Sequence, residues 1–201
     1  MVNVVTKIGV LALQGDFAEH IGIFQRLGIA AQEVRHPQEL AGLDGLVIPG
    51  GESTTVTRLI SEFALLEPLR ERAQNGFPIW GTCAGMIVLA QRASGLEWPT
   101  LDALAIAVRR NAFGRQVDSF ETDLAVPALG QQAFHAIFIR APIVEEVGDG
   151  VEVLAKLDNG NAVAVRQANA LATAFHPELT EDDRFHRYFI DMVRRHKDEQ
   201  A

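Results

Sequence analysis

The sequence contains a single cysteine, Cys83, among its 201 residues. One cysteine excludes an internal disulfide, and this scarcity is typical of proteins that stay in a reducing compartment. It also leaves only one candidate for any cysteine chemistry. No group of cysteines and histidines has the spacing of a zinc site, so we expect no bound metal.

Long apolar runs are also missing. The longest stretches have about six residues, whereas a membrane-spanning helix needs roughly eighteen or more. The run from Ile8 to Leu13 is ended by Gln14-Gly15-Asp16, too early for a signal peptide, and no small-x-small cleavage site follows. We therefore expect a cytoplasmic protein without a membrane partner.

Positive charge is in deficit, with 18 Lys and Arg against 26 Asp and Glu, a formal net charge of -8. A nucleic-acid-binding protein needs a basic stripe that neutralises phosphates. The pairs Arg109-Arg110 and Arg194-Arg195 are too short for one, so no nucleic-acid partner is expected. A content of 48% hydrophobic and 22% charged residues is typical of a soluble globular protein.

The first half of the chain alternates between strand and helix patterns. Lys7 to Leu13 is a continuous apolar run, typical of a strand buried on both faces, and Phe17, Ile21, Phe24 and Leu27 follow at helical spacing. Further strands are predicted at Ala30 to Val34, Gly45 to Pro49 and Pro78 to Gly81. Helices are predicted at Thr54 to Ala73, with an interruption near Pro68, and at Ala84 to Ala93. This order implies right-handed crossovers and a mostly parallel sheet.

After about residue 104, short β-like runs separated by turn signals predict antiparallel hairpins. They include Phe134 to Ile139, Val151 to Leu157, Ala162 to Val165 and Leu171 to Phe175, and a final amphipathic helix carries Phe185, Phe189, Met192 and Val193. No linker or repeat is evident, so we expect one domain over residues 1–201. The predicted fold is an α/β three-layer sandwich, a mostly parallel central sheet with antiparallel additions.

Cys83 lies in Gly81-Thr82-Cys83-Ala84-Gly85, between a predicted strand and a predicted helix. This is the G-x-nucleophile-x-G elbow with cysteine in place of serine. The glycines tolerate a crowded turn, and the helix N-terminus favours the reactive thiolate. The N–H of Ala84 then points to where an oxyanion develops. A lone cysteine is more often a buried structural residue, but this context favours a nucleophile.

A cysteine nucleophile needs a histidine, usually oriented by a third group. His20, His186 and His196 fall in predicted helices among polar neighbours, and we expect them at the surface. His36 precedes a proline in a turn, and His135 alternates within a strand. His176 differs, because it follows a predicted strand in His176-Pro177-Glu178, where an extended chain places the first and third residues on one face. The alternative is a proline-bounded turn with a solvated carboxylate.

These motifs resemble the class I, triad-type glutamine amidotransferases, whose fold is flavodoxin-like. The segment from Gly45 to Thr55, GLVIPGGESTT, narrows the resemblance to the glutaminase subunit of pyridoxal 5'-phosphate synthase. Supporting segments are Leu13-Gln14-Gly15, Arg109 to Gln116, Phe138 to Pro142 and His176 to Thr180. The resemblance covers essentially the whole chain.

The resemblance implies Cys83 as the nucleophile, His176 as the acid and base, and Glu178 as its orienter. It places glutamine against Gly51, Glu52, Ser53, Arg109, Ile139 and Arg140, and an oxyanion against Gly50, Gly51 and Ala84. Arginine and glutamate are suitable complements for the carboxylate and ammonium of an amino acid. Without the resemblance, Gly50-Gly51 is an ordinary turn before a helix capped by Ser53 or Thr54, and both arginines are solvated.

The implied reaction is hydrolysis of L-glutamine to glutamate and ammonia, which needs no organic cofactor. The implied partner is the synthase subunit that uses the ammonia to build pyridoxal 5'-phosphate, in a large hetero-oligomer. The alternatives are a glutaminase subunit for histidine or anthranilate biosynthesis, a cysteine peptidase or chaperone-like relative of the same fold, and a regulatory subunit without turnover.

Overall fold

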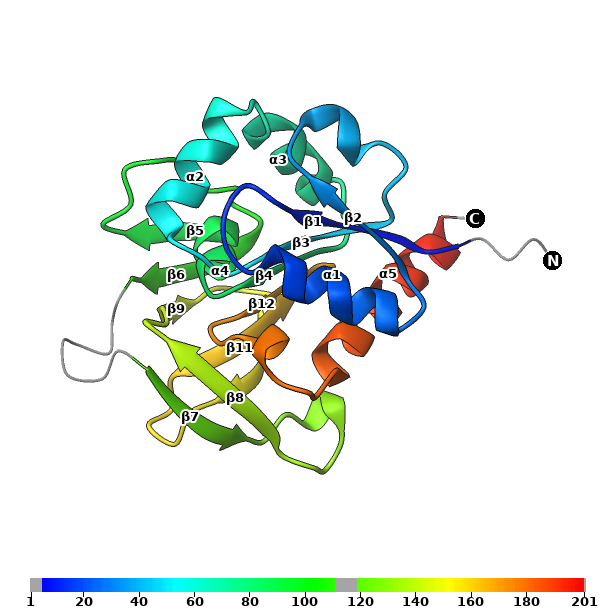
Figure 1. Ribbon diagram of the computed structural model, residues 1–201. Helices are drawn as coiled ribbons and strands as arrows, with labels where there is room; N and C mark the ends of the chain where they lie inside the picture. Colours follow the sequence, from blue (N-terminus) through cyan, green and yellow to red (C-terminus); the bar gives the residue numbers. More distant parts are fainter. Residues whose placement is uncertain (1–4, 111–118, 201) are drawn as a thin grey trace.

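The computed structural model describes residues 5–110 and 119–200, in which a central sheet separates two layers of helices (Figure 1). The sheet has seven strands in the order β10-β11-β12-β4-β3-β1-β2. Their bounds are β1 Lys7–Leu11, β2 Ala30–Val34, β3 Gly45–Ile48, β4 Ile79–Thr82, β10 Glu152–Lys156, β11 Ala162–Gln167 and β12 Ala170–Thr173. The predicted α/β sandwich is confirmed.

Strands β12, β4, β3, β1 and β2 are parallel, whereas β11 pairs antiparallel with both β10 and β12. The antiparallel additions are therefore confirmed as well. Two small sheets complete the fold, β5-β6-β9 and β7-β8. Their strands are β5 Ala90–Ser94, β6 Leu104–Arg109, β7 Ser119–Leu124, β8 Phe134–Ile139 and β9 Ile143–Val147.

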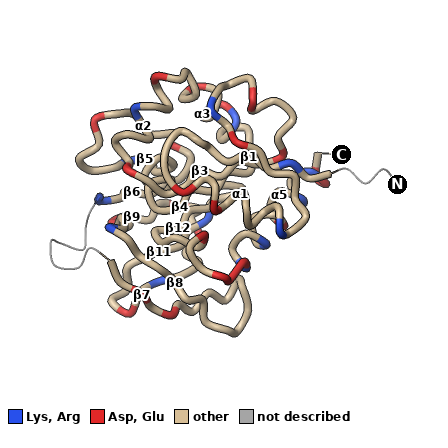
Figure 2. Tube along the Cα trace, in the orientation of Figure 1, with Lys and Arg blue, Asp and Glu red and all other residues tan. Residues whose placement is uncertain are grey.

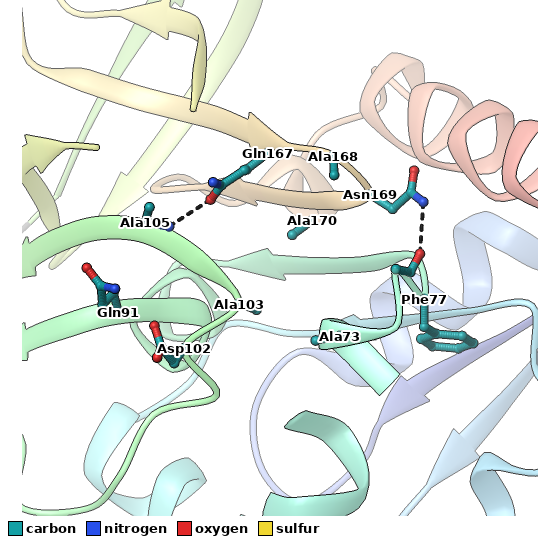
Figure 3. Close-up of a pocket in the computed structure, with 11 residues that line it drawn as sticks. Ala73, Phe77, Gln91, Asp102, Ala103, Ala105, Gln167, Ala168, Asn169 and Ala170 are labelled. Atoms are coloured by element: carbon teal, nitrogen blue, oxygen red, sulfur yellow. Dashed lines mark hydrogen bonds between the residues drawn. The ribbon is translucent and has the colours of Figure 1, made fainter. Parts of the chain in front are cut away.

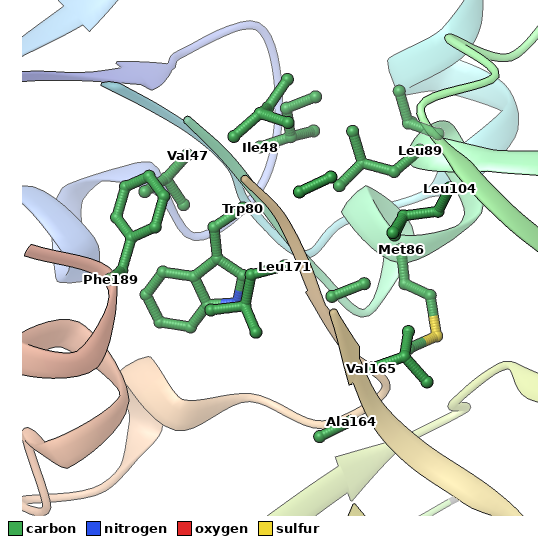
Figure 4. Packing of buried hydrophobic residues seen from close by; sticks show 14 of the residues in the cluster. Val47, Ile48, Trp80, Met86, Leu89, Leu104, Ala164, Val165, Leu171 and Phe189 are labelled. Carbon is green, nitrogen blue, oxygen red and sulfur yellow. The ribbon is translucent and has the colours of Figure 1, made fainter. Parts of the chain in front are cut away.

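Five α-helices accompany the strands in the described residues. They are α1 Phe17–Arg26, α2 Ser53–Glu62, α3 Leu66–Gln74, α4 Ala84–Leu89 and α5 Arg184–Glu199, and the short 3-10 turns are η1 Pro37–Leu40, η2 Pro127–Leu129 and η3 Pro177–Leu179. Figure 4 shows Val47, Trp80 and Phe189 on the α5 side of the sheet and Ile48 and Met86 on the α4 side. Because neighbouring residues of a strand face opposite ways, each apolar strand fills both layers.

Two predicted helices differ from the structure. The segment from Thr54 to Ala73 is broken at Ala64, which has a φ of 55°, and not at Pro68. Pro68 is the third residue of α3, where a missing N–H costs no intrahelical bond. The helix predicted from Ala84 to Ala93 ends at Leu89, because the following residues form β5 and pair with β6.

The expectation that His20 and His186 lie at the surface is wrong, since both rings are fully buried. His20 shares the inward face of α1 with Ile23 and Phe24, three and four residues further on. His186 shares that of α5 with Phe189 and the apolar residues beyond it. This apolar spacing was readable in the sequence and outweighs the polar immediate neighbours.

Acidic and basic positions are both spread over the surface segments (Figure 2). In the ranges 5–110 and 119–200, no helix is long and apolar enough to cross a bilayer.

Candidate active site

The predicted site residues gather at the carboxyl ends of the parallel strands. The loop after β1 carries Asp16, the loop after β3 carries Gly50 and Gly51, β4 leads into Cys83, and the chain after β12 reaches His176. Ligand sites of open α/β sheets form at this edge, because the loops of neighbouring parallel strands meet there.

Cys83 forms the elbow that its motif predicts. It has a φ of 47° and a ψ of -101° and sits directly before α4, with 6% of its surface exposed. Its N–H donates to the carbonyl of Thr173 at 2.8 Å, which fastens the turn to β12. The Sγ atom lies 3.7 Å from the carbonyl oxygen of Ile139. A positive φ in a residue with a side chain is a strained conformation that clusters at functional sites.

The two glycines of the elbow allow close backbone contacts. A Cβ at Gly81 would lie 2.4 Å from the carbonyl of Gly85, and a Cβ at Gly85 would lie 2.0 Å from the carbonyl oxygen of Ile48. Neither contact can be relieved by turning a flexible side chain, since the obstructing atoms belong to the backbone. The G-x-C-x-G spacing therefore has a steric reason.

His176 and Glu178 form a buried pair. Nδ1 of His176 lies 2.7 Å from Oε1 of Glu178, and the two residues are 4% and 5% exposed. Asp16 approaches the same nitrogen, with Oδ2 at 3.4 Å. Because Nδ1 is hydrogen-bonded to Glu178, the other ring nitrogen, Nε2, is the one that can transfer a proton in the cavity.

The charges around His176 favour its protonated form. Burial opposes that form, but Asp16, Cys83 and Glu178 outweigh it and raise the pKa of His176 to about 12. An imidazolium beside Cys83 is the arrangement that stabilises a thiolate.

Asp16, His176 and Glu178 also offer three atoms within 4.8 Å of one another, the spacing of a metal site. Nδ1 of His176 already shares a proton with Glu178 at 2.7 Å. A histidine that binds a metal through this nitrogen must give up that proton. We therefore interpret the group as a hydrogen-bonded acid–base network.

A cavity of about 370 Å³ joins Cys83 and His176. Most of the residues predicted to bind glutamine or an oxyanion line it, namely Gly51, Glu52, Ser53, Ala84, Ile139 and Arg140. Asp16, Ile87 and Arg110 line it too and were not predicted. Gly50 lies beside it, since a Cβ there would be 2.4 Å from Cε1 of His176.

Glu52 is the N-cap of α2, where Ser53 or Thr54 was the alternative expectation. Its carboxylate accepts hydrogen bonds from the N–H groups of Thr54 and Thr55 at 3.0 and 2.7 Å. Burial opposes the charged form, but these bonds lower the pKa of Glu52. Nη2 of Arg110 lies 3.3 Å from this carboxylate. The cap thus holds a negative charge at the cavity wall.

Arg109 is not among the described residues that line the cavity, and the expectation that it binds the substrate stays a prediction. Its Nε donates to Glu145 at 2.7 Å on the strand pair β6-β9, and its side chain is 52% exposed. Arg110 points the other way, as neighbouring residues of an extended chain do. It donates to Thr54 at 2.8 Å, and its buried Nε has no partner among the described residues. The remainder of this motif, 111–116, lies outside those residues.

A separate cavity of about 430 Å³ lies at the amino ends of β4 and β12 (Figure 3). Two of its polar side chains form hydrogen bonds with the backbone of neighbouring segments. Gln167 accepts a hydrogen bond from the N–H of Ala105 at 2.8 Å, and Asn169 donates to the carbonyl of Gly76 at 2.8 Å. These side chains are already engaged in joining segments of the sheet.

Known proteins match this chain over nearly its full length. The SNO glutamine amidotransferase family matches residues 10–195. A relative from Dehalococcoides mccartyi, named pyridoxal 5'-phosphate synthase subunit PdxT, is 60% identical over 193 residues, covering 95% of this chain and 99% of the relative. A relative of the same name from Herpetosiphon aurantiacus is 57% identical over 190 residues, with 92% and 99% covered.

Solved structures agree with these matches. A crystal structure of a glutamine amidotransferase has a TM-score of 0.87 at 52% identity, covering 92% of this chain and 98% of that one. A putative GMP synthase subunit from Thermoplasma acidophilum shares the fold, with a TM-score of 0.71 at 20% identity and 98% of both chains covered. Sequence and structure therefore agree that this chain belongs to the SNO glutamine amidotransferase family.

Proposed function

We propose that this chain hydrolyses L-glutamine to glutamate and ammonia, and that it supplies the ammonia to the synthase subunit of pyridoxal 5'-phosphate synthase. One observation carries the chemistry: a cysteine on a strained elbow shares a cavity with a histidine whose Nδ1 is held by a buried glutamate. Family membership and the names of the relatives support the pathway.

In the proposed reaction, the thiolate of Cys83 attacks the side-chain amide carbon of glutamine, and a carbon–sulfur bond forms. Protonated His176 gives its proton to the leaving nitrogen as the carbon–nitrogen bond breaks, which releases ammonia. His176 then takes a proton from water, whose oxygen attacks the thioester. Glutamate leaves and the thiolate is restored. Glu178 keeps the imidazole oriented through both steps.

Backbone N–H groups are the proposed donors to the oxyanion. Ala84 is the first residue of α4, so its N–H has no intrahelical acceptor. The second donor comes from the Gly50-Gly51 segment. The carbonyl of Gly50 accepts from the N–H of Asp16 at 3.2 Å, and a trans peptide therefore points the N–H of Gly51 away from Asp16.

Charged side chains at the cavity wall are the proposed receptors for the amino acid end of glutamine. Arg110 and Arg140 suit its carboxylate, and Glu52 suits its ammonium. Among the residues that the structure describes, the buried Nε of Arg110 has no partner, and a substrate carboxylate would satisfy this donor. A second subunit is proposed because ammonia in neutral water becomes mostly ammonium, which is not nucleophilic. We also propose a large hetero-oligomer, which the family resemblance implies, and a cytoplasmic location, which fits the single cysteine.

Glutamate release from glutamine, measured with and without the synthase subunit of the same organism, tests this proposal. We expect low activity alone, stimulation by the synthase, and loss of activity in Cys83→Ala, with cosedimentation of the two subunits in an ultracentrifuge. Turnover unchanged in Cys83→Ala would contradict the mechanism. Stimulation by a histidine or anthranilate synthase subunit instead would contradict the pathway.

A further inference from the structure

Two fully buried histidines lie behind the cavity. His20 comes from α1 and His186 from α5, and His20 Nδ1 lies 2.9 Å from His186 Nε2. The ring of Trp80 packs edge-on against both, with centroids 5.4 and 5.0 Å away. Apolar side chains would fill this space without the cost of desolvating imidazoles, so packing alone does not explain the pair.

His20 also reaches the carboxylate of Glu178. Its Nε2 lies 3.4 Å from Oε2 of Glu178 and 3.4 Å from Oγ1 of Thr82. The other carboxylate oxygen, Oε1, faces His176. In the described part of the chain, the buried Oε2 has no hydrogen bond of regular geometry. Among those residues, the Nε2 atom of His20 is the ionisable group that contacts this oxygen. The two residues lie far apart in the sequence, and only the fold brings them together.

Both rings are neutral. Burial, with help from the neighbouring His186 and His176, lowers the pKa of His20 well below its ordinary value. Burial likewise lowers the pKa of His186 to about 3. Each ring therefore carries one N–H near pH 7, and the position of that proton determines what His20 offers to Glu178.

The neighbours Glu178 and His186 determine which ring nitrogen of His20 carries the proton. If the proton were on Nδ1, the lone pair of Nε2 would face the carboxylate of Glu178, and the two would repel each other. This arrangement would also force the proton of His186 onto Nδ1, which has no partner among the described residues. With its proton on Nε2, His20 places an N–H beside the carboxylate of Glu178 and the hydroxyl of Thr82, and its Nδ1 accepts a hydrogen bond from His186. Because buried N–H groups without partners are rare, both considerations favour this second arrangement.

We propose that His20 is a positioning residue for glutamine hydrolysis. As a neutral ring with its proton on Nε2, it holds Oε2 of Glu178 so that Oε1 remains on His176. This inference rests on the proposed role of Glu178 in orienting His176. Burial raises the pKa of Glu178, and an N–H donor opposes this effect by stabilising the carboxylate.

The effect of losing His20 falls on turnover and not on substrate binding. Without the N–H donor, Glu178 rotates or takes up a proton, and His176 then spends less time in the orientation that serves Cys83. His20 does not line the cavity that holds the proposed glutamine-binding groups. Affinity for glutamine is therefore preserved.

Three variants, assayed with the synthase subunit present, separate this role from packing. His20→Leu removes the donor at similar volume, and we expect kcat to fall about tenfold or more while KM stays within about twofold. His20→Gln supplies a side-chain amide N–H at a similar distance from the backbone, and we expect kcat within about threefold of wild type. Phe24→Leu is the matched control, since Phe24 lies on the same face of α1 and packs on His186 with centroids 5.2 Å apart.

Equal kcat values for His20→Leu and Phe24→Leu would overturn the proposal, and so would a His20→Gln variant as slow as His20→Leu. The proposed function fails differently, through a wild-type chain that releases no glutamate with its synthase. The two failures are therefore distinguishable.

NMR of the ¹⁵N-histidine-labelled chain tests the proton position without any turnover. Signals missing from His20→Gln identify His20, and we expect the nitrogen shifts of a neutral ring protonated on Nε2 at pH 7. A ring protonated on Nδ1, or an imidazolium, would overturn the proposal. This measurement needs only the folded wild type and the donor-retaining variant, so it decides the question even where His20→Leu does not fold.

Discussion

Oδ2 of Asp16 lies 3.4 Å from Nδ1 of His176, the same nitrogen that Glu178 engages at 2.7 Å. One carboxylate follows β1 and is partly exposed, and the other follows β12 and is buried. Two negative groups on one side of a ring stabilise the imidazolium, which is the form that donates a proton to the leaving ammonia.

Asp16→Asn tests the contribution of the outer carboxylate. Removing its charge lowers the pKa of His176, so the proton needed for catalysis is lost at lower pH. We expect the alkaline limb of the kcat/KM profile to move to lower pH, together with the His176 titration followed by NMR. Asp123→Asn is the control, because Asp123 pairs with the exposed His135 on β7-β8. An alkaline limb that does not move would contradict the prediction.

His186 makes the folded protein sensitive to acid. Its pKa is about 3 in the folded protein against an ordinary value of 6.5, mainly because of burial. Between these values the unfolded chain binds the proton and the folded chain does not, so the free energy of unfolding falls as the pH falls. The loss due to His186 is about 1.4 kcal/mol for each pH unit below 6.5.

Urea unfolding at pH 7 and pH 5.5 measures this loss. In His186→Phe we expect the difference between the two free energies of unfolding to be smaller than in the wild type by about 1 kcal/mol. His196→Phe is the matched control, since it makes the same substitution at a half-buried histidine of the same helix. An unchanged difference in His186→Phe would show that this ring is not buried in its neutral form.

Arg110 and Arg109 are neighbours that face different surroundings, and the same substitution should affect them differently. Arg110→Gln removes a charge from the cavity wall, and we expect KM for glutamine to rise about tenfold or more with a smaller change in kcat. Arg109→Gln breaks an exposed pair with Glu145, and both constants should stay within about twofold. The reverse pattern in steady-state kinetics would assign the substrate to Arg109.

Gly85→Ala and Gly22→Ala should change stability in opposite directions. A Cβ at Gly85 meets the backbone of Ile48 at 2.0 Å, so we expect a loss of about 3 kcal/mol or more in the free energy of unfolding, or no folded protein. A Cβ at Gly22 meets only the end of the Arg26 side chain, at 3.7 Å, within α1. There alanine should stabilise by about 0.5–1 kcal/mol. Thermal unfolding of a normally folded Gly85→Ala at wild-type temperature would contradict the steric argument.

Local patterns were enough to predict the elbow and most of the sheet. The apolar runs that became β1, β2, β3 and β4 are short and bounded by turns, and a strand buried on both faces needs nothing more to be recognised. The G-x-C-x-G spacing predicted a crowded strand-to-helix turn, because its steric requirement lies within five residues. The His-Pro-Glu segment differs from the expected extended chain, because Pro177–Leu179 forms the 3-10 turn η3, although His176 and Glu178 still meet.

Relations between distant segments depended on the tertiary structure. Which of two adjacent arginines faces the cavity depends on how β6 pairs with β9, and the end of α4 depends on β6 accepting β5 as a partner. The approach of Asp16 to His176 depends on two loops meeting at one edge of the sheet.

The sequence by itself determined that Cys83 occupies a nucleophile elbow and that His176 and Glu178 follow a strand, because those features are set by neighbouring residues. Only the tertiary structure decided that His20 and His186, expected at the surface, lie buried behind Glu178. Their environment is made by α1, α5 and β4 together, and burial is a property of the assembled layers.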